Sequence, residues 1–182
     1  MNRRDLFAGL SGAALLPLAV GGARAQPPTP NAPLTAIGAD EYKNRTLMAG
    51  TLAKQASELA LRKATNPKVK EFANLEVMEQ TAMAQVLTLQ ASPPPARLDE
   101  RHAAVLKELQ GASGAEFDKA YVKAQVEGHA ELLTVQNAYT SGRGQDTVAM
   151  LSDDTARIAT LAKAAIQTHL TMLKELNAVL RG

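Results

Sequence analysis

The fold is decided by residues 66–91, which read NPKVKEFANLEVMEQTAMAQVLTLQA. Asn66 is a favourable N-cap residue, and Pro67 suits the first turn of a helix because no backbone N–H is needed there. At about 100° per residue, the apolar side chains of this stretch share one face of a helix. They are Val69, Phe72, Ala73, Met83 and Leu87. The stretch therefore predicts an amphipathic helix from Pro67 to about Ala91.

Further helices are predicted on both sides of this stretch, because Ala, Leu, Lys, Glu and Gln dominate and no segment alternates with period two. Their expected ranges are 40–64, 98–109, 113–141 and a last helix that ends near residue 180. Two tight hairpins joined by a long crossover are typical of ferritin-like bundles. The sequence thus predicts an all-α, ferritin-like up-down four-helix bundle over residues 40–182. A short extra helix lies in the crossover between its second and third helices.

The start of the last helix decides which of its residues lie level with the preceding helix. The turn at Gly142-Arg143-Gly144 allows a start at Asp146, which at about 1.5 Å per residue leaves His129 and His169 roughly 13 Å out of level. Ser152-Asp153-Asp154 offers a second N-cap, and a start there brings the two histidines level. Any site that uses both histidines therefore requires a break near Asp153.

The first 25 residues have the composition of an export signal. Arg3-Arg4-Asp5-Leu6-Phe7 resembles the twin-arginine export motif, and an apolar run continues to Gly22. Ala23-Arg24-Ala25 has the small-x-small form that signal peptidases cut. The apolar run is shorter than the about 20 residues that a membrane-spanning helix needs. We therefore expect a periplasmic or secreted mature protein without a transmembrane segment, with twin-arginine export favoured over general secretion.

Composition excludes several classes of site and partner. Residues 26–39 are rich in proline without helical or strand period, which predicts a disordered tether. The chain has no cysteine, so disulfides and thiolate metal sites are excluded. Its net charge of +2 falls to zero without residues 1–25, which carry three arginines and one aspartate. With aromatic residues at 3%, nothing favours nucleic acid as a partner. The oligomeric state stays open.

Several polar side chains fall where the predicted bundle should be apolar. On helical wheels, the inward-facing ones are Glu76, Gln80, Gln125, His129 and His169, with Glu79 near the edge of its apolar face. A buried carboxylate without partners costs several kcal/mol, so something must satisfy it. We therefore expect these groups to meet in one interior, near mid-height of the bundle.

Two interpretations of this polar cluster are open. In the first, it is a hydrogen-bond network that fixes helix register, with Glu76 and Gln80 held by the histidines and by Tyr121 or Tyr139. In the second, His129, His169 and Glu76 bind one metal ion or small ligand. Two imidazoles and one carboxylate suit zinc, iron or copper. Gln80, Gln125, Glu79 and Tyr121 would then form the supporting polar core.

Two further functions are weaker alternatives. A di-iron redox enzyme needs Glu-x-x-His on two helices and two more carboxylates. This chain has only Glu127-Gly128-His129, a spacing that turns the two side chains about 200° apart, so Glu127 points to solvent. A module that docks an envelope protein, or that serves a stress-linked structural role without a ligand, is the other alternative. Catalysis is disfavoured.

Three short motifs carry a family resemblance. They are Asn66 to Ala73, Phe117 to Tyr121 followed by His129, and His169-Leu170. In this order they resemble an exported bacterial family catalogued as domain of unknown function 4142, over roughly Tyr42 to Leu176. The resemblance implies a ferritin-like fold and export, with no established activity.

The chain departs from that family at two places. Many members of the family that this chain resembles carry Asp-His at the positions of Glu79-Gln80, and many carry an acidic residue at the position of Ala53. Ligand roles are therefore not carried over to Ala53 or Gln80.

Two single residues complete the expectations. His102, on the short connecting helix, is expected to be exposed. Gly128 lies inside a predicted helix, where glycine costs about 1 kcal/mol relative to alanine. That cost indicates a close approach of another helix at Gly128.

Overall fold

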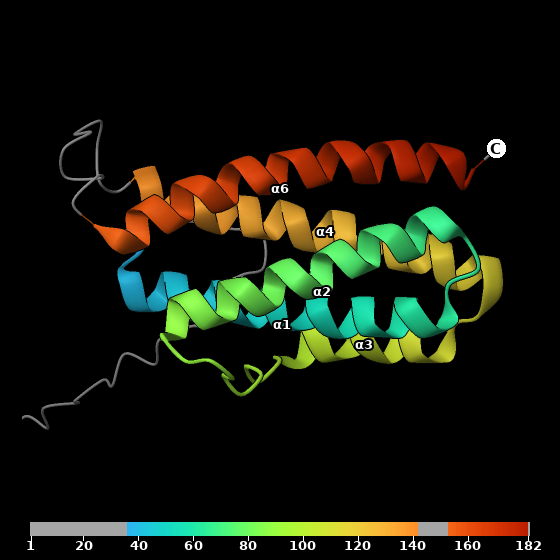
Figure 1. Ribbon diagram of the computed structural model, residues 1–182, viewed down its shortest axis with the longest axis horizontal. Helices are drawn as coiled ribbons and strands as arrows, with labels where there is room; N and C mark the ends of the chain where they lie inside the picture. Colours follow the sequence, from blue (N-terminus) through green and yellow to red (C-terminus); the bar gives the residue numbers. More distant parts are fainter. Residues whose placement is uncertain (1–35, 142–152, 182) are drawn as a thin grey trace, which may run out of the picture. The chain divides into compact units, whose positions relative to one another are not determined.

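The computed structural model describes residues 36–141 and 153–181 (Figure 1). Its helices are α1 (Ala39–Lys63), α2 (Pro67–Thr88), α3 (Glu100–Gly111), α4 (Gly114–Ser141) and α6 (Asp154–Val179). No strand occurs in these two ranges, so the predicted all-α class is confirmed. The expected export signal, most of the expected tether and the turn predicted at residues 142–144 lie outside the described residues.

The long helices pack as neighbours along their lengths. α1 packs along α2, and α4 packs along α6, while α1 also lies against α4 and so joins the two pairs (Figure 1). α3 occupies the connection between α2 and α4 and packs on α1 and α4. This is the short helix that the sequence predicts in the crossover, and it begins at Glu100 rather than Leu98.

Buried apolar side chains form one cluster toward each end of the helix pairs. One cluster contains Phe72, Phe117 and Leu173, from α2, α4 and α6. The opposite cluster contains Tyr42 and Tyr139, whose rings stack with centroids 4.3 Å apart. Along each of α2, α4 and α6, the polar residues predicted to face inward fall between these clusters. The polar interior is therefore enclosed by apolar packing at both ends.

Side chains cap the helices that position this interior. The carboxylate of Asp118, which is 1% exposed, accepts hydrogen bonds from the backbone N–H groups of Thr65 and Asn66 at the start of α2. Asp153 caps α6, since its Oδ1 accepts from the backbone N–H groups of Thr155 and Ala156 at 2.8 and 3.2 Å. These bonds satisfy N–H groups that have no partner within the helix. α6 thus begins at Asp154, as a site that uses both histidines requires.

The structure corrects the predicted end of α2. The helix stops at Thr88 rather than near Ala91, because Leu89 turns into the left-handed region with φ 56°. Its backbone N–H still bonds to the carbonyl of Gln85. The triple proline follows only after this turn and therefore does not itself end the helix.

The expectation for Gly128 is wrong. A Cβ atom at Gly128 would meet nothing within 4 Å, so no neighbouring helix presses on it. The close contact instead occurs at Gly50 in α1, where a Cβ would lie 2.6 Å from Oε1 of Gln80 in α2. Gly50 therefore leaves the space that the Gln80 side chain occupies.

Neither described range contains a helix that combines the length and the apolar composition of a membrane span.

Candidate metal centre

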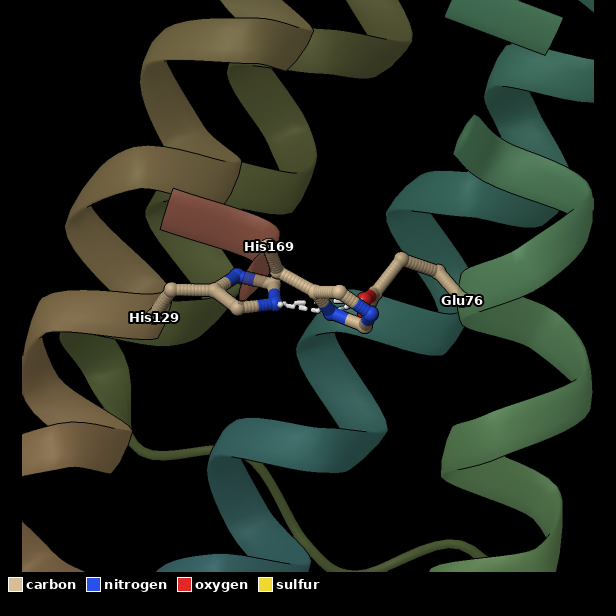
Figure 2. Close-up of side chains that lie close together, drawn as sticks. All are labelled: Glu76, His129 and His169. Carbon is tan, nitrogen blue, oxygen red and sulfur yellow. Dashed lines mark hydrogen bonds and ion pairs between the residues drawn. The ribbon is translucent and has the colours of Figure 1, made fainter. Parts of the chain in front are cut away.

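Three titratable side chains from three helices meet in the interior (Figure 2). Glu76 comes from α2, His129 from α4 and His169 from α6, and they are 0%, 1% and 4% exposed. Glu76 Oε1 lies 2.8 Å from His169 Nδ1 and 3.1 Å from His129 Nε2, and the two ring nitrogens are 3.1 Å apart. The structure thus brings together the three residues that the sequence proposes as metal ligands. We call this group the Glu–His–His centre.

The second nitrogen of His129 fixes which atom faces the centre. His129 Nδ1 lies 2.8 Å from the backbone carbonyl oxygen of Gln125, one turn earlier in α4. A carbonyl oxygen only accepts, so Nδ1 carries a proton, and Nε2 donates to Glu76 when the ring is charged or offers a lone pair when it is neutral. Nε2 is directed at Glu76 and His169. Gln125 therefore supports the centre through its backbone rather than its side chain.

The remaining atoms of Glu76 and His169 are also held by second partners. His169 Nε2 lies 3.2 Å from Oε2 of Glu79, whose side chain is 39% exposed. Gln80 Nε2 donates to Oε2 of Glu76 at 3.3 Å. Partners of this kind orient the ligands in metal sites, where a histidine typically donates its second N–H to a carboxylate or a carbonyl. Glu79 and Gln80 thus lie where supporting residues are expected.

Tyr121 and the Gln125 side chain belong to a neighbouring network. Tyr121 Oη lies 2.8 Å from Oγ of Ser57, and Gln125 Nε2 donates to the same Oγ and to the carbonyl of Ala53. Neither side chain bonds to Glu76, so the expected contact of Tyr121 with the centre is absent among these bonds. The sequence does not predict a place for Ser57 in this network, because nothing in the pattern of α1 separates a buried serine from the small residues around it.

Charges and burial compete at the centre. Burial by itself raises the pKa of Glu76, but hydrogen bonds and charge from His129 and His169 outweigh it and lower the pKa to about 2. Burial by itself lowers the pKa of His169, and the hydrogen bond with Glu76 and the nearby Glu79 carboxylate outweigh it, so the net shift is upward. The centre therefore favours a carboxylate beside a positive charge.

Counting protons shows what holds the three atoms together. When the His129 ring is neutral and its Nδ1 donates to the carbonyl, neither His129 Nε2 nor the Glu76 carboxylate brings a proton to the shared point. The proton on His169 Nδ1 is then the one that both can accept. A metal cation at the same point would replace this proton and receive three lone pairs.

The spacing of the three atoms suits such a cation. Bonds of about 2.0 to 2.2 Å from a metal to nitrogen or oxygen, at angles of about 90° to 110°, separate two ligands by roughly 2.8 to 3.5 Å. The three observed separations of 2.8, 3.1 and 3.1 Å fall within this interval. The Phe72 ring covers the imidazoles, with centroids 5.5 Å from His169 and 6.0 Å from His129. The two nitrogens and one carboxylate oxygen match zinc, iron or copper.

The third histidine contradicts its prediction. His102 is 1% exposed rather than solvated. Its Nδ1 lies 2.6 Å from Oδ1 of Asp99, the N-cap residue of α3, and its Nε2 lies 3.4 Å from Oε2 of Glu131 in α4. Arg101 binds both carboxylate oxygens of Glu131, at 2.6 and 2.7 Å. We call these four residues the His102 clasp. The spacing of Asp99 and His102, typical of a helix N-terminus, is the signal that could have indicated it.

Comparison with known proteins gives a family. The sequence profile described as Domain of unknown function (DUF4142) matches residues 24–176. No curated protein and no solved structure matches the chain. The matched segment contains all five described helices up to Leu176 of α6, and with them the whole Glu–His–His centre. The chain therefore belongs to the family described as Domain of unknown function (DUF4142).

Proposed function

We propose that Glu76, His129 and His169 bind one transition-metal ion inside an exported, ferritin-like four-helix bundle. The observation that supports this proposal is the orientation of the three proposed ligands. Every other polar atom of the two rings and of the carboxylate has a partner outside the group, and the remaining three atoms face one another at 2.8 to 3.1 Å.

A metal-free network is the second candidate. The raised pKa of His169 and the lowered pKa of Glu76 describe an ion pair that is complete without a metal. In that case the centre fixes the register of α2, α4 and α6 and has no ligand. The two candidates differ in one property, which is whether the protein retains a metal through purification.

A single metal ion is favoured over a di-iron arrangement. Among the described residues, one group of three or more His, Asp and Glu side chains converges, and it is the Glu–His–His centre. Glu127 is exposed and pairs with Lys123, as its spacing from His129 predicts. α1 contributes Ala53, whose carbonyl accepts from Gln125, where a second metal would need a carboxylate. The proposed role is therefore binding without a dinuclear redox reaction.

Export is proposed from the sequence. The twin arginine, the apolar run and the Ala23-Arg24-Ala25 site support a periplasmic or secreted protein. A twin-arginine route would carry the bundle across the membrane already folded, with its metal in place. The absence of cysteine suits an oxidising compartment, because the proposed ligand set contains no thiolate that could be oxidised there.

The experiment measures metal in protein exported with its own first 25 residues. The chain is purified from the periplasm, its mass reports cleavage after Ala25, and elemental analysis reports bound metal. We expect about one equivalent of zinc, iron or copper per chain, lost on substitution His169→Ala. His102→Ala is the matched control, because it removes another buried histidine and should leave the metal in place. Circular dichroism checks that both variants fold.

A supporting variant sharpens the result. Glu79→Gln removes the carboxylate behind His169 Nε2 and should weaken metal affinity by about 10- to 100-fold, as for other outer partners of metal-bound histidine. Metal content below a tenth of an equivalent in the wild type, unchanged after dialysis against each of the three ions, would establish the metal-free network instead.

A further inference from the structure

A small cavity adjoins the Glu–His–His centre, and the metal binding proposed above does not require it. It has a volume of about 40 Å³ and is bordered by both imidazoles. Its walls are largely apolar and include Met83, Leu132 and Ile166. A water-sized space needs about 10 to 15 Å³, so the cavity has room for roughly two or three non-hydrogen atoms.

The end of the cavity away from the histidines carries an unused polar group. Gln136 borders the cavity, is fully buried and donates from Nε2 to Thr46 Oγ1 at 3.5 Å. Its Oε1 makes no hydrogen bond with any residue in the described ranges. Gln136 lies two helical turns after His129 on the same face of α4, and both side chains border the cavity. A buried amide oxygen without a partner costs free energy, which a bound ligand would recover.

The metal itself would also have a coordination position to fill. Three protein ligands leave at least one position open on zinc, iron or copper, and sites that process or bind small molecules keep such a position. The histidines supply two of the three ligands and border the cavity. An exogenous ligand in the cavity would therefore be next to the metal.

From these observations we infer that the cavity receives a small Lewis base of two or three non-hydrogen atoms, one end on the metal and the other at the Gln136 amide. This inference rests on the proposed metal site. The amide suits either kind of ligand end, since turning its plane presents Nε2 instead of Oε1, and the Thr46 hydroxyl both donates and accepts. The small volume and the Glu79 carboxylate at its border disfavour larger anions and chelating molecules.

Gln80 lies between this partly open cavity and a larger opening at the surface. The side chain borders the cavity and also a surface groove of about 570 Å³ between α1, α2 and residues 91–96. Gly50 leaves the space in which its amide sits. A turn of this one side chain away from Glu76 would connect the groove with the cavity. The group that separates the groove from the cavity is thus the partly exposed side chain of Gln80 and not a layer of packed apolar side chains.

Azide is the probe, because it has three atoms in a line and binds metals through a lone pair. The protein is loaded with Cu²⁺, its metal content is measured, and azide is titrated while the visible charge-transfer absorption is recorded. We expect a saturable new band in the wild type. Ala165→Leu, which fills the cavity from α6, should weaken azide binding by about tenfold or more at unchanged metal content.

The control and a second variant make the outcome decisive. Ala164→Leu places the same side chain on the exposed face of α6 and should leave azide affinity unchanged. Gln136→Met keeps the volume and removes the amide, and should weaken azide by about three- to tenfold. Metal-loaded protein that shows no azide band, or azide binding equal in Ala165→Leu and Ala164→Leu, overturns the cavity inference and leaves the metal site standing. Protein that retains none of Cu²⁺, zinc and iron overturns both.

Discussion

The two regions with buried histidines differ in where their ring nitrogens point. In the His102 clasp, the two nitrogens of one ring face two separate carboxylates, those of Asp99 and Glu131. In the Glu–His–His centre, one nitrogen from each of two rings faces the same carboxylate oxygen. The carboxylates of the clasp are partly exposed, whereas Glu76 is fully buried.

This difference distinguishes the structural role of the His102 clasp from the binding role proposed for the Glu–His–His centre. Nδ1 of His102 pairs with Asp99, and Nε2 lies 3.1 Å from an Arg101 guanidinium nitrogen and 3.4 Å from Glu131, so neither nitrogen shares a point with another imidazole. In the centre, the outer nitrogens are saturated and the inner ones converge. Burial is nearly equal for His102 and His129, at 1% each, so burial alone does not identify the ligands. The two regions are told apart by the convergence of the three inner atoms of the Glu–His–His centre on one another.

The largest expected effect on stability comes from removing one carboxylate from each region. Glu76→Ala leaves two buried imidazoles without the anion that both contact, and breaking a buried pair in this way costs about 3 to 5 kcal/mol. Glu131→Ala removes a carboxylate that is 27% exposed, and we expect a loss of about 1 kcal/mol or less. The free energies of unfolding are measured by urea titration at neutral pH, with a chelator present.

The chelator makes this a comparison of the metal-free states. Glu76→Gln serves as control, since it keeps the volume and removes only the charge, and its cost should lie between those of the two alanine variants. Equal losses for Glu76→Ala and Glu131→Ala would erase the distinction between the regions.

Much of this comparison could be anticipated from periodicity. The wheel of residues 66–91 places Glu76 on the buried face because apolar residues surround it at helical spacing, and the same holds for His129 and His169. Whether the two histidines lie level could not be decided from periodicity, because it depends on where α6 begins. The cap at Asp153 settles that point.

The remaining errors have a common physical origin. His102 is buried although its own helix is short and polar, because Arg101 and Glu131 close over it from α3 and α4. Gly50 and not Gly128 meets a neighbour, because the contact depends on where the Gln80 side chain of α2 lies. Both facts depend on pairs of residues far apart in the sequence, and a pattern within one helix carries no information about them.

The second test uses the pH dependence of the His102 clasp. Burial lowers the pKa of His102, but hydrogen bonds with Glu131 and Asp99 outweigh both burial and the nearby Arg101 charge and raise it above 6.5. Its contribution to stability is therefore complete below pH 6.5 and is lost as the pH rises through the raised value. Burial raises the pKa values of Asp99 and Glu131, and hydrogen bonds from His102 outweigh it, so both fall below their ordinary 3.8 and 4.5.

These shifts define a window of maximal stabilisation. The carboxylates contribute above about pH 4.5 and lose their contribution as the pH falls, so the clasp is strongest between about pH 4.5 and 6.5. The difference in unfolding free energy between wild type and His102→Gln should peak in that window at about 1 kcal/mol, because the carboxylates are partly exposed. Urea titrations at pH 4, 5.5 and 8 measure it. A difference that is constant across these values would show that His102 carries no charge in the clasp.

The smallest test compares two glycines and separates the centre from the helices that carry it. Gly128→Ala meets open space next to His129, so the gain in helix propensity should stabilise the protein by about 0.5 to 1 kcal/mol without altering metal affinity. Gly50→Ala gains the same propensity but displaces the end of the Gln80 side chain, which can turn away at little cost. Its stability should change little, whereas metal affinity should fall by several-fold because Gln80 no longer orients Glu76. Thermal unfolding and a competitive metal titration measure the two effects, and a Gly50→Ala variant with unchanged metal affinity would show that Gln80 plays no part in the centre.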